Sequence, residues 1–302
     1  MKKGTGKRTI ITKNTRYLFC FAGPACIYMG IIAVYPILYN FYLMFRNMST
    51  RNFMNHQFVG LDTIKELLDK GVIWTAAYNT VLFTVVCTVI QFVIGFAFAM
   101  LLSRKFCMAK LSKSLMLISW LIPMTVTGIL FKFIFQTDSG ILNFILQQIG
   151  VIDSPIEWLT NSRTAIWCII AANCWVGIPF DMVLLSTGLA NIPDNVLESA
   201  AIDGAGRVQR FLHITLPMLK PTMYSILILG VIYTFKVFDL VQVMTGGGPV
   251  NATEMLSTYA YKLGFREYNF SQASVVANFM FILLFIMGVI YLRFVNDDEG
   301  IE

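Results

Sequence analysis

The chain has 302 residues, of which 57% are hydrophobic and only 13% are charged. Soluble domains of ordinary composition carry about a quarter charged residues, so this composition excludes a soluble globular protein and predicts a chain that lies in a bilayer. The net charge of +6 comes from basic residues that flank apolar runs. That placement is typical of anchoring at a membrane surface and argues against a nucleic-acid site.

Six apolar runs follow one another along the chain, and each is long enough to cross a hydrocarbon core that needs about 20 residues. The runs lack strict alternation and are about twice as long as a barrel strand needs, which favours α-helices. We therefore predict an all-α integral membrane protein with six transmembrane helices, at 17–45, 77–102, 111–135, 164–189, 216–236 and 274–295.

Basic residues predict the orientation of these helices, because cytoplasmic loops are enriched in lysine and arginine. The segment 1–16, the loop 104–113 and the loop 190–217 carry the excess, whereas the loops 46–76, 136–163 and 238–273 balance their bases with acids. Both termini are therefore expected in the cytoplasm, and 296–302 forms an acidic tail. The apolar run after the basic segment is too long for a cleavable signal peptide, so we expect it to be retained.

The fourth run contains polar, glycine and proline residues that are unusual at membrane depth. Pro179 removes a backbone hydrogen bond, and the freed carbonyl is tolerated only beside buried protein or a wet cavity. A solute pathway would supply that cavity, and four residues share one helical face toward it: Asn173, Val176, Gly177 and Phe180. For Asp181 in the same run we expect a structural hydrogen-bonding role near the loop.

The loop at 190–217 has the features of a docking element. Pro193 suits the first turn of a short helix that Asn191 or Asp194 would cap and Gly204 would end. A second helical run follows and is expected to end at Pro217. On the first helix, small and apolar residues share one face with an acid, which would let a partner surface approach closely: Glu198, Ala201, Ile202 and Ala205.

No segment of the chain has the features of a nucleotide or metal site. The segment 4–8 lacks P-loop spacing, and 246–248 precedes no helix that starts with Lys-Ser or Lys-Thr. His56 and His213 lie in separate loops, and the six cysteines are spread over spans and one loop, so packing is their expected role. We expect the chain to bind no cofactor and to be no enzyme.

Several motifs resemble those of a known family. Glu198-Ser199-Ala200-Ala201, then Gly204 and, after nine residues, Ile214-x-Leu216-Pro217, resembles the cytoplasmic loop of bacterial ABC importer permeases, with Ser199 replacing the usual alanine. The segments 21–24, 35–36 and 245–254 are similar to the first helix and the last outer loop of carbohydrate-type permeases. The resemblance implies a type I importer permease fold with a cytoplasmic coupling helix in a bacterial cell membrane.

The family also implies partners and residue roles. The partners would be a second permease in a heterodimer, two ATP-hydrolysing subunits inside and a solute-binding protein outside. The coupling residues would be Glu198, Ala200, Ala201, Asp203 and Gly204, and the loop facing the binding protein would hold Gly246, Gly247, Gly248 and Pro249. By resemblance to maltose-type permeases, the pathway would add Trp120, Met124, Tyr233 and Val237 to the four residues of the fourth run. Met124 and Val237 are apolar where the maltose-type pattern is polar, which argues against maltose itself.

The resulting prediction is a permease subunit for a sugar or oligosaccharide, with three alternatives left open. The first is an importer of the same fold for glycerol-phosphate or another polar solute. An anionic solute would want basic residues along the pathway, yet Lys132 and Lys236 lie near outer span ends, where they are expected to reach the interface. A secondary carrier would transport without ATP, and a membrane enzyme would need a catalytic constellation. The sugar, the companion permease and the ATPase are not specified by this sequence.

Overall fold

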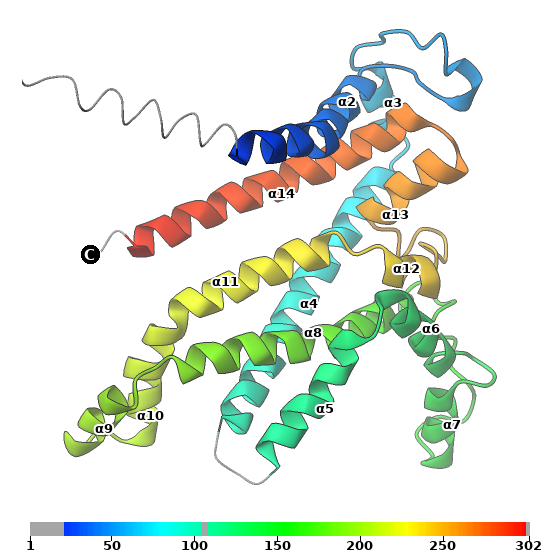
Figure 1. Cartoon of the computed structure of the whole chain (residues 1–302). Helices are drawn as coiled ribbons and strands as arrows, with labels where there is room; N and C mark the ends of the chain where they lie inside the picture. Colours follow the sequence, from blue (N-terminus) through cyan, green and yellow to red (C-terminus); the bar gives the residue numbers. More distant parts are fainter. Residues whose placement is uncertain (1–20, 104–107, 300–302) are drawn as a thin grey trace, which may run out of the picture.

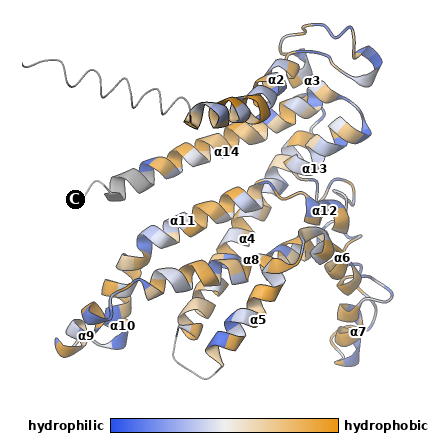
Figure 2. Ribbon diagram, viewed as in Figure 1, coloured by the Kyte–Doolittle hydropathy of each residue, from blue (hydrophilic) through white to orange (hydrophobic). Residues whose placement is uncertain are grey.

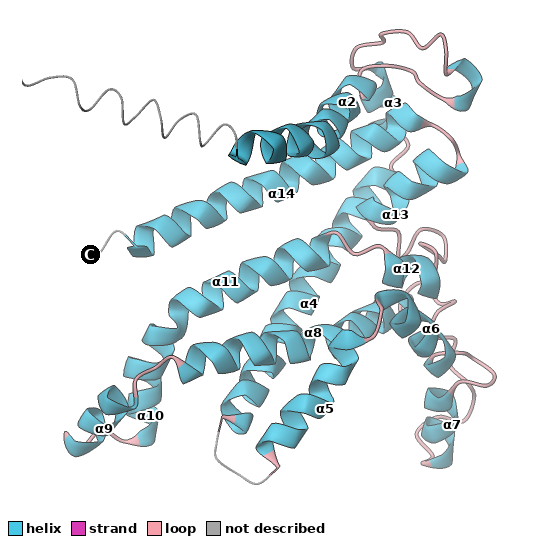
Figure 3. Cartoon of the chain, viewed as in Figure 1, coloured by secondary structure: helices cyan, strands magenta, loops and turns pink. Residues whose placement is uncertain are grey.

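The structure is a computed structural model that describes residues 21–103 and 108–299. Within these ranges the chain is helices joined by loops, and the only extended pairing is an isolated bridge between Arg46 and Phe58 (Figure 3). The all-α prediction is confirmed for this part of the chain. The helical elements are η1 (Gly30–Val34), α2 (Tyr35–Leu43), η2 (Thr50–Asn52), α3 (Asp62–Asp69), α4 (Val72–Leu102), α5 (Ala109–Leu121), α6 (Met124–Ile134), α7 (Ile141–Gln148), α8 (Ala165–Ala190), α9 (Asp194–Ile202), α10 (Arg207–Arg210), η3 (Phe211–Thr215), α11 (Leu216–Phe235), α12 (Asp239–Met244), α13 (Leu256–Tyr261), η4 (Lys262–Arg266) and α14 (Phe270–Glu299).

Five helical stretches in the described residues are long and apolar enough to cross a membrane, and a bent pair of helices makes a sixth. Apolar residues cover most of the length of these helices in Figure 2, whereas the α9–α10 turn at one end is more polar. The five are Phe21–Leu43, Val72–Leu102, Ala165–Ala190, Arg207–Met244 and Phe270–Arg293. The last helix extends through 296–299, so the first residues of the expected acidic tail are helical. The segment 1–16 lies outside the described residues.

The third predicted span is not one straight helix. Residues 111–135 fold as α5 and α6, which meet at an angle of 96°. The bend falls at Ile122 and Pro123, both with extended ψ values, and proline disfavours helical backbone at the residue before it. The chain therefore turns sideways at this point, and α6 runs on to pack against α12.

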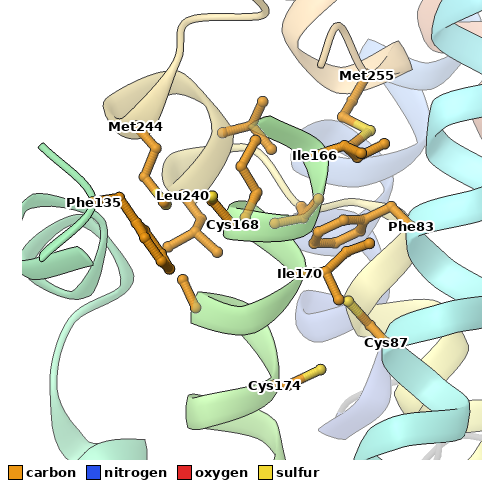
Figure 4. Packing of buried hydrophobic residues seen from close by; sticks show 14 residues of the cluster. Phe83, Cys87, Phe135, Ile166, Cys168, Ile170, Cys174, Leu240, Met244 and Met255 are labelled. Atoms are coloured by element: carbon orange, nitrogen blue, oxygen red, sulfur yellow. The ribbon is translucent and has the colours of Figure 1, made fainter. Parts of the chain in front are cut away.

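The helices α4 and α8 cross at the centre of the fold (Figure 1). Gly95 of α4 permits the contact, since a side-chain carbon there would lie 2.9 Å from Cβ of Asp181 and 3.1 Å from the backbone nitrogen of Met182. A buried apolar cluster joins α4, α8 and α12 on one side of the crossing (Figure 4). It includes Phe83, Cys87, Cys168 and Cys174, so these three cysteines have the packing role that was expected.

The first and last helices form a pair at the edge of the bundle, where α2 lies along α14 (Figure 1). Asn40 and Asn278 join them: the Asn278 amide donates to the Asn40 backbone oxygen at 3.0 Å, and the Asn40 amide donates to Asn278 Oδ1 at 3.3 Å. Reciprocal amide bonds satisfy polar groups that would otherwise be costly between membrane helices. This pair leaves α4, α8, α11 and the bent α5–α6 segment to surround the candidate site.

Candidate functional site

A cavity of about 470 Å³ lies between α4, α5, α6, α8, α11 and the start of α12. All of the pathway residues predicted from the sequence line it, although they come from three separate apolar runs. The helical face predicted within α8 therefore does point into one space. The predicted residues in its wall are Trp120, Met124, Asn173, Val176, Gly177, Phe180, Tyr233 and Val237.

Three aromatic rings form a row along the cavity. Trp120 stacks on Phe180 with ring centroids 5.6 Å apart and planes 23° apart, and Phe180 meets Tyr233 edge-on at 6.3 Å. Trp120 and Tyr233 are both about half exposed, at 48% and 57%. Rings that keep an open face offer a surface on which the apolar C–H face of a sugar ring can stack.

Polar side chains interrupt the apolar wall where α4 meets α8. Gln91 Nε2 donates to the backbone oxygen of Asn173 at 3.2 Å. The Gln91 amide fills the space above Gly177, so a side chain at that glycine would overlap it. Both Gln91 and Asn173 are buried within the chain yet line the cavity, which places amide groups beside the aromatic row.

Asp181 lies in the cavity wall. It is only 4% exposed, and its Cβ packs against Gly95 at the α4–α8 crossing. The structural hydrogen-bonding role expected for its carboxyl stays a prediction.

Lys236 lies exposed at the C-terminal end of α11, near a span end as predicted, and it also lines the cavity. Its Nζ lies 5.0 Å from the centre of the Tyr233 ring, a cation–π contact. The sequence placed this residue near a span end but could not show that the chain turns into α12 immediately afterwards. Lys132 donates to the Val243 backbone oxygen at 3.4 Å and is exposed.

Other cavity residues were missed in the sequence. Gln91 was detectable in principle, because it is the single amide in the apolar stretch between 81 and 102. Most of the rest carried no local signal, since glycine, threonine, phenylalanine and leucine are common in any membrane helix, and Lys236 and Asp239 lie at and just beyond the end of the fifth apolar run. The missed residues are Gln91, Asp181, Gly230, Thr234, Lys236, Phe238, Asp239 and Leu240.

The predicted docking helix is present as α9 at the far end of the bundle from α12 (Figure 1). Gly204 has a φ of +86°, a conformation that favours glycine, so it ends the helix as predicted. Pro193 precedes the helix, and in the described chain neither Asn191 nor Asp194 caps it with a side chain, which corrects the capping prediction. Asp194 instead places its charge in the first turn, where a carboxylate is favourable.

The α9 surface combines acidic and apolar groups. Glu198, Ala201, Asp203 and Gly204 are exposed, and Ala200 is half-buried. Ile202 is 87% exposed, a large apolar side chain left open at the tip. Arg210 donates to the Leu197 backbone oxygen at 3.4 Å, so α9 is held to the following helix rather than hanging free.

The second helical run does not end at Pro217. Residues 207–215 continue through η3 into α11, and Pro217 stands in the first turn of that helix. Proline is tolerated there because the first-turn N–H groups have no intrahelical partner. Residues 207–235 therefore form one connected helical stretch that leads from the turn after α9 to Tyr233 in the cavity wall.

The glycine-rich loop is packed tightly at the opposite end. A side-chain carbon at Gly247 would lie 2.6 Å from a carboxyl oxygen of Glu254, which is buried beneath the loop. Burial raises the pKa of the Glu254 carboxyl, and the hydrogen bond donated by Thr258 opposes that shift. Gly246, Gly248 and Pro249 are half-buried and Gly247 is buried, whereas the neighbouring Val250 is 92% exposed. The exposed tip of this loop is therefore Val250, which the sequence prediction left out.

No group of three or more His, Cys, Asp or Glu side chains is arranged to hold a metal in the described ranges. His56 and His213 each lie near a backbone oxygen of their own loop or helix, at 3.1 and 3.2 Å. These local contacts fit surface histidines with no shared ligand.

Comparisons with known proteins agree with this architecture. Residues 91–297 match the model of a family described as binding-protein-dependent transport system inner membrane component. The sulfoquinovosyl glycerol transport system permease protein of Agrobacterium fabrum is 30% identical over 91% of this chain and 89% of its own length. The trehalose/maltose transport system permease protein of Thermococcus litoralis is 34% identical over 78% of this chain and 79% of its own length.

A solved structure has the same fold. A chain of a bacterial ABC transporter involved in the import of the acidic polysaccharide alginate superposes with a TM-score of 0.82. The match covers 97% of this chain and 99% of that chain at 20% identity. The six-helix prediction thus corresponds to the fold of an ABC importer permease, with the third span broken at Pro123. The chain belongs to the family of binding-protein-dependent transport system inner membrane components.

Proposed function

We propose that this chain is the permease subunit of an ATP-driven, binding-protein-dependent importer of a sugar or oligosaccharide. The observation that carries the proposal is the convergence of an aromatic row and buried amides on one cavity in a member of this transport family. Two similar proteins are named for sulfoquinovosyl glycerol and for trehalose or maltose transport, which supports a carbohydrate substrate.

The charges around the cavity support a neutral solute over glycerol-phosphate. Lys236 is the base in its wall, and Asp181 and Asp239 are acids in the same wall. A phosphate group would meet one cation and two carboxyl groups, a poor match for an anion. A sugar needs no net charge, because its hydroxyls exchange hydrogen bonds with amides while its ring faces stack on aromatics.

For coupling, we propose that α9 docks on an ATP-hydrolysing subunit through Glu198, Ala200, Ala201, Asp203 and Gly204. The support is an exposed acidic and apolar tip that Arg210 holds to α10, and α10 runs on through η3 into α11. The ATP would be bound by the partner subunits, and this chain would bind no cofactor. A second permease would complete the cavity, and both termini would lie in the cytoplasm with α9.

The opposite end of the molecule would meet the solute-binding protein. The proposed contact is the loop of Gly246, Gly247, Gly248 and Pro249, with Val250 as its exposed tip. The restrained backbone of this loop, closed by a hydrogen bond of 2.7 Å between the Thr245 and Thr253 hydroxyls, would present that tip with little ordering cost.

The proposal is tested by purifying the complex from native membranes in mild detergent and identifying its subunits by mass spectrometry. We expect an ATPase and a second permease to co-purify with this chain. Changing Gly206 to alanine should leave the yields of these two subunits unchanged. Recovery of this chain alone as a stable homo-oligomer would favour a secondary carrier and overturn the proposal.

The substrate class is tested separately with the recovered complex in proteoliposomes. Sugars presented by the binding protein should stimulate ATP hydrolysis, and Trp120→Leu should weaken transport because it removes the ring that stacks on Phe180. Trp167→Leu is the matched control, since Trp167 is similarly exposed but lies outside the cavity. Equal effects of both substitutions would contradict the sugar-stacking role.

A further inference from the structure

The short helix α7 exposes the side that a helix usually buries. Its buried residue is a polar one, Asn143, at 3% exposure. Its outward residues and those just beyond its end are large and apolar, between 48% and 64% exposed: Ile141, Phe144, Ile145, Ile149 and Val151. Gln148, a polar residue in the last turn of α7, also lies on this exposed side. A helix arranged this way in water would leave a continuous apolar surface without a partner.

Asn143 fixes this orientation through four hydrogen bonds. Its amide nitrogen donates to the backbone oxygens of Thr137 and Ile156, both at 2.9 Å. Its side-chain oxygen accepts from the Ile156 backbone nitrogen at 3.2 Å and from the Trp158 indole nitrogen at 2.8 Å. Rotating α7 to hide its apolar face would break all four bonds, so the outward face is a built feature of the loop.

The apolar face of α7 continues a surface that begins on α6. The two helices are in contact, and Leu130 and Phe133 of α6 are 44% and 65% exposed. The α5–α6 pair is apolar enough to enter a membrane. The short helix α7 lies beside this pair, away from the long helices of the bundle (Figure 1). The face thus extends the apolar surface of a helix pair that is apolar enough to enter a membrane.

We propose that α7 is an interfacial helix whose apolar face lies in the bilayer leaflet at the α12 end of the bundle. In the orientation given under the proposed function this is the outer leaflet. The helix contains no charged residue, so its attachment rests on apolar contact alone and should not respond to lipid charge or to salt. Its role would be to hold the 136–163 loop, and with it the α6–α12 corner, at a constant depth.

Nitroxide accessibility in nanodiscs containing the assembled complex tests this assignment. The six native cysteines are replaced by alanine, and Phe144→Cys or Ile145→Cys is labelled; Asp153→Cys, an exposed acid of the same loop, is the reference for water. The measured quantity is the ratio of collision with oxygen, which concentrates in hydrocarbon, to collision with a polar nickel chelate. We expect this ratio to be several-fold higher at 144 and 145 than at 153. Changing from zwitterionic to anionic lipid should leave the ratios unchanged.

Three results would overturn the assignment. Ratios at 144 and 145 equal to that at 153 would place the helix in water, and low collision with both reagents would mean that protein covers it. Ratios that depend on lipid charge would contradict attachment by apolar contact. Each labelled variant is accepted only if the complex co-purifies as with the cysteine-free parent, and Ile149→Cys replaces either site that fails. The readout needs no transported solute, so it stands apart from the test of substrate.

Discussion

Gly177 separates the Gln91 amide from α8, and Gly177→Ala should disturb the cavity more than the same substitution at Gly230, the other glycine of its wall. The new carbon would lie 2.6 Å from Gln91 Nε2, far inside contact distance. Gln91 is the flexible partner, so its amide must move toward the cavity and release the Asn173 backbone oxygen. The substitution therefore changes both a buried hydrogen bond and the shape of the space.

The expected cost follows from these two changes. The Asn173 oxygen keeps its bond within α8, so losing the Gln91 hydrogen bond costs about 0.5–1.5 kcal/mol. Forcing an extra methyl group into a filled space costs about 1–3 kcal/mol more. Alanine recovers up to about 1 kcal/mol of helix propensity relative to glycine. The net destabilisation should be on the order of 1–2 kcal/mol, and the displaced amide should raise the half-saturating substrate concentration for uptake.

Gly230→Ala is the matched control, because Gly230 lines the same cavity in a neighbouring helix. Its added carbon would lie 3.7 Å from the Thr88 methyl group, an ordinary contact. Thermal unfolding of the purified complex and uptake by proteoliposomes should show a defect for Gly177→Ala and none for Gly230→Ala. The same midpoint and uptake for Gly177→Ala as for wild type, or an equal defect in the control, would refute the reasoning.

Three further predictions concern the loops. Gly204→Ala forces a side chain into positive φ at a cost of about 1–2 kcal/mol and should reduce recovery of the ATPase, whereas Gly206→Ala, at a φ of −67° in open space, should not; equal recovery from both variants would contradict the role of the turn. Asn143→Ala leaves the half-buried Trp158 indole N–H and the Ile156 backbone N–H without their acceptor, and it should lower the free energy of unfolding by about 1–3 kcal/mol. We expect faster proteolysis of the 136–163 loop, while Gln147→Ala on the exposed side of the same helix should match wild type. Burial raises the folded pKa of Glu254, so the unfolded chain releases this proton at lower pH than the folded chain. The wild-type melting temperature relative to Glu254→Gln should therefore be highest below pH 4.5 and fall as the pH rises above it; a difference that grows with pH would show the opposite shift.

Local sequence patterns predicted much of the helical architecture. The run at 164–189 predicted α8 (Ala165–Ala190) to within a residue at each end, because twenty apolar residues in sequence have few alternatives in a bilayer. Gly204 predicted the end of α9, because its left-handed backbone depends on the one residue that lacks a Cβ. The prediction that Asn191 or Asp194 caps α9 was wrong, because a residue type that is able to cap a helix need not have its side chain in position to do so.

The candidate site was predicted only in part. Asn173, Val176, Gly177 and Phe180 recur at helical spacing, so their shared face could be inferred from one segment. The convergence of Trp120 and Tyr233 on that face came from family resemblance, since no local pattern brings three helices together. The role of these residues in transport remains a prediction, whereas their common cavity is a feature of the structure.

The sequence by itself determined that this chain enters a membrane as helices, roughly where the spans lie, and which family it belongs to. Apolar length, a left-handed glycine and a spaced motif are properties of short segments, so they survive without knowledge of the fold. Only the tertiary structure decided that the third span breaks by 96° at Pro123, that Lys236 lines the cavity, and that Gln91 rests on Gly177. Each of these features depends on which faces of distant helices meet. Close packing between residues far apart in the chain determines which faces these are.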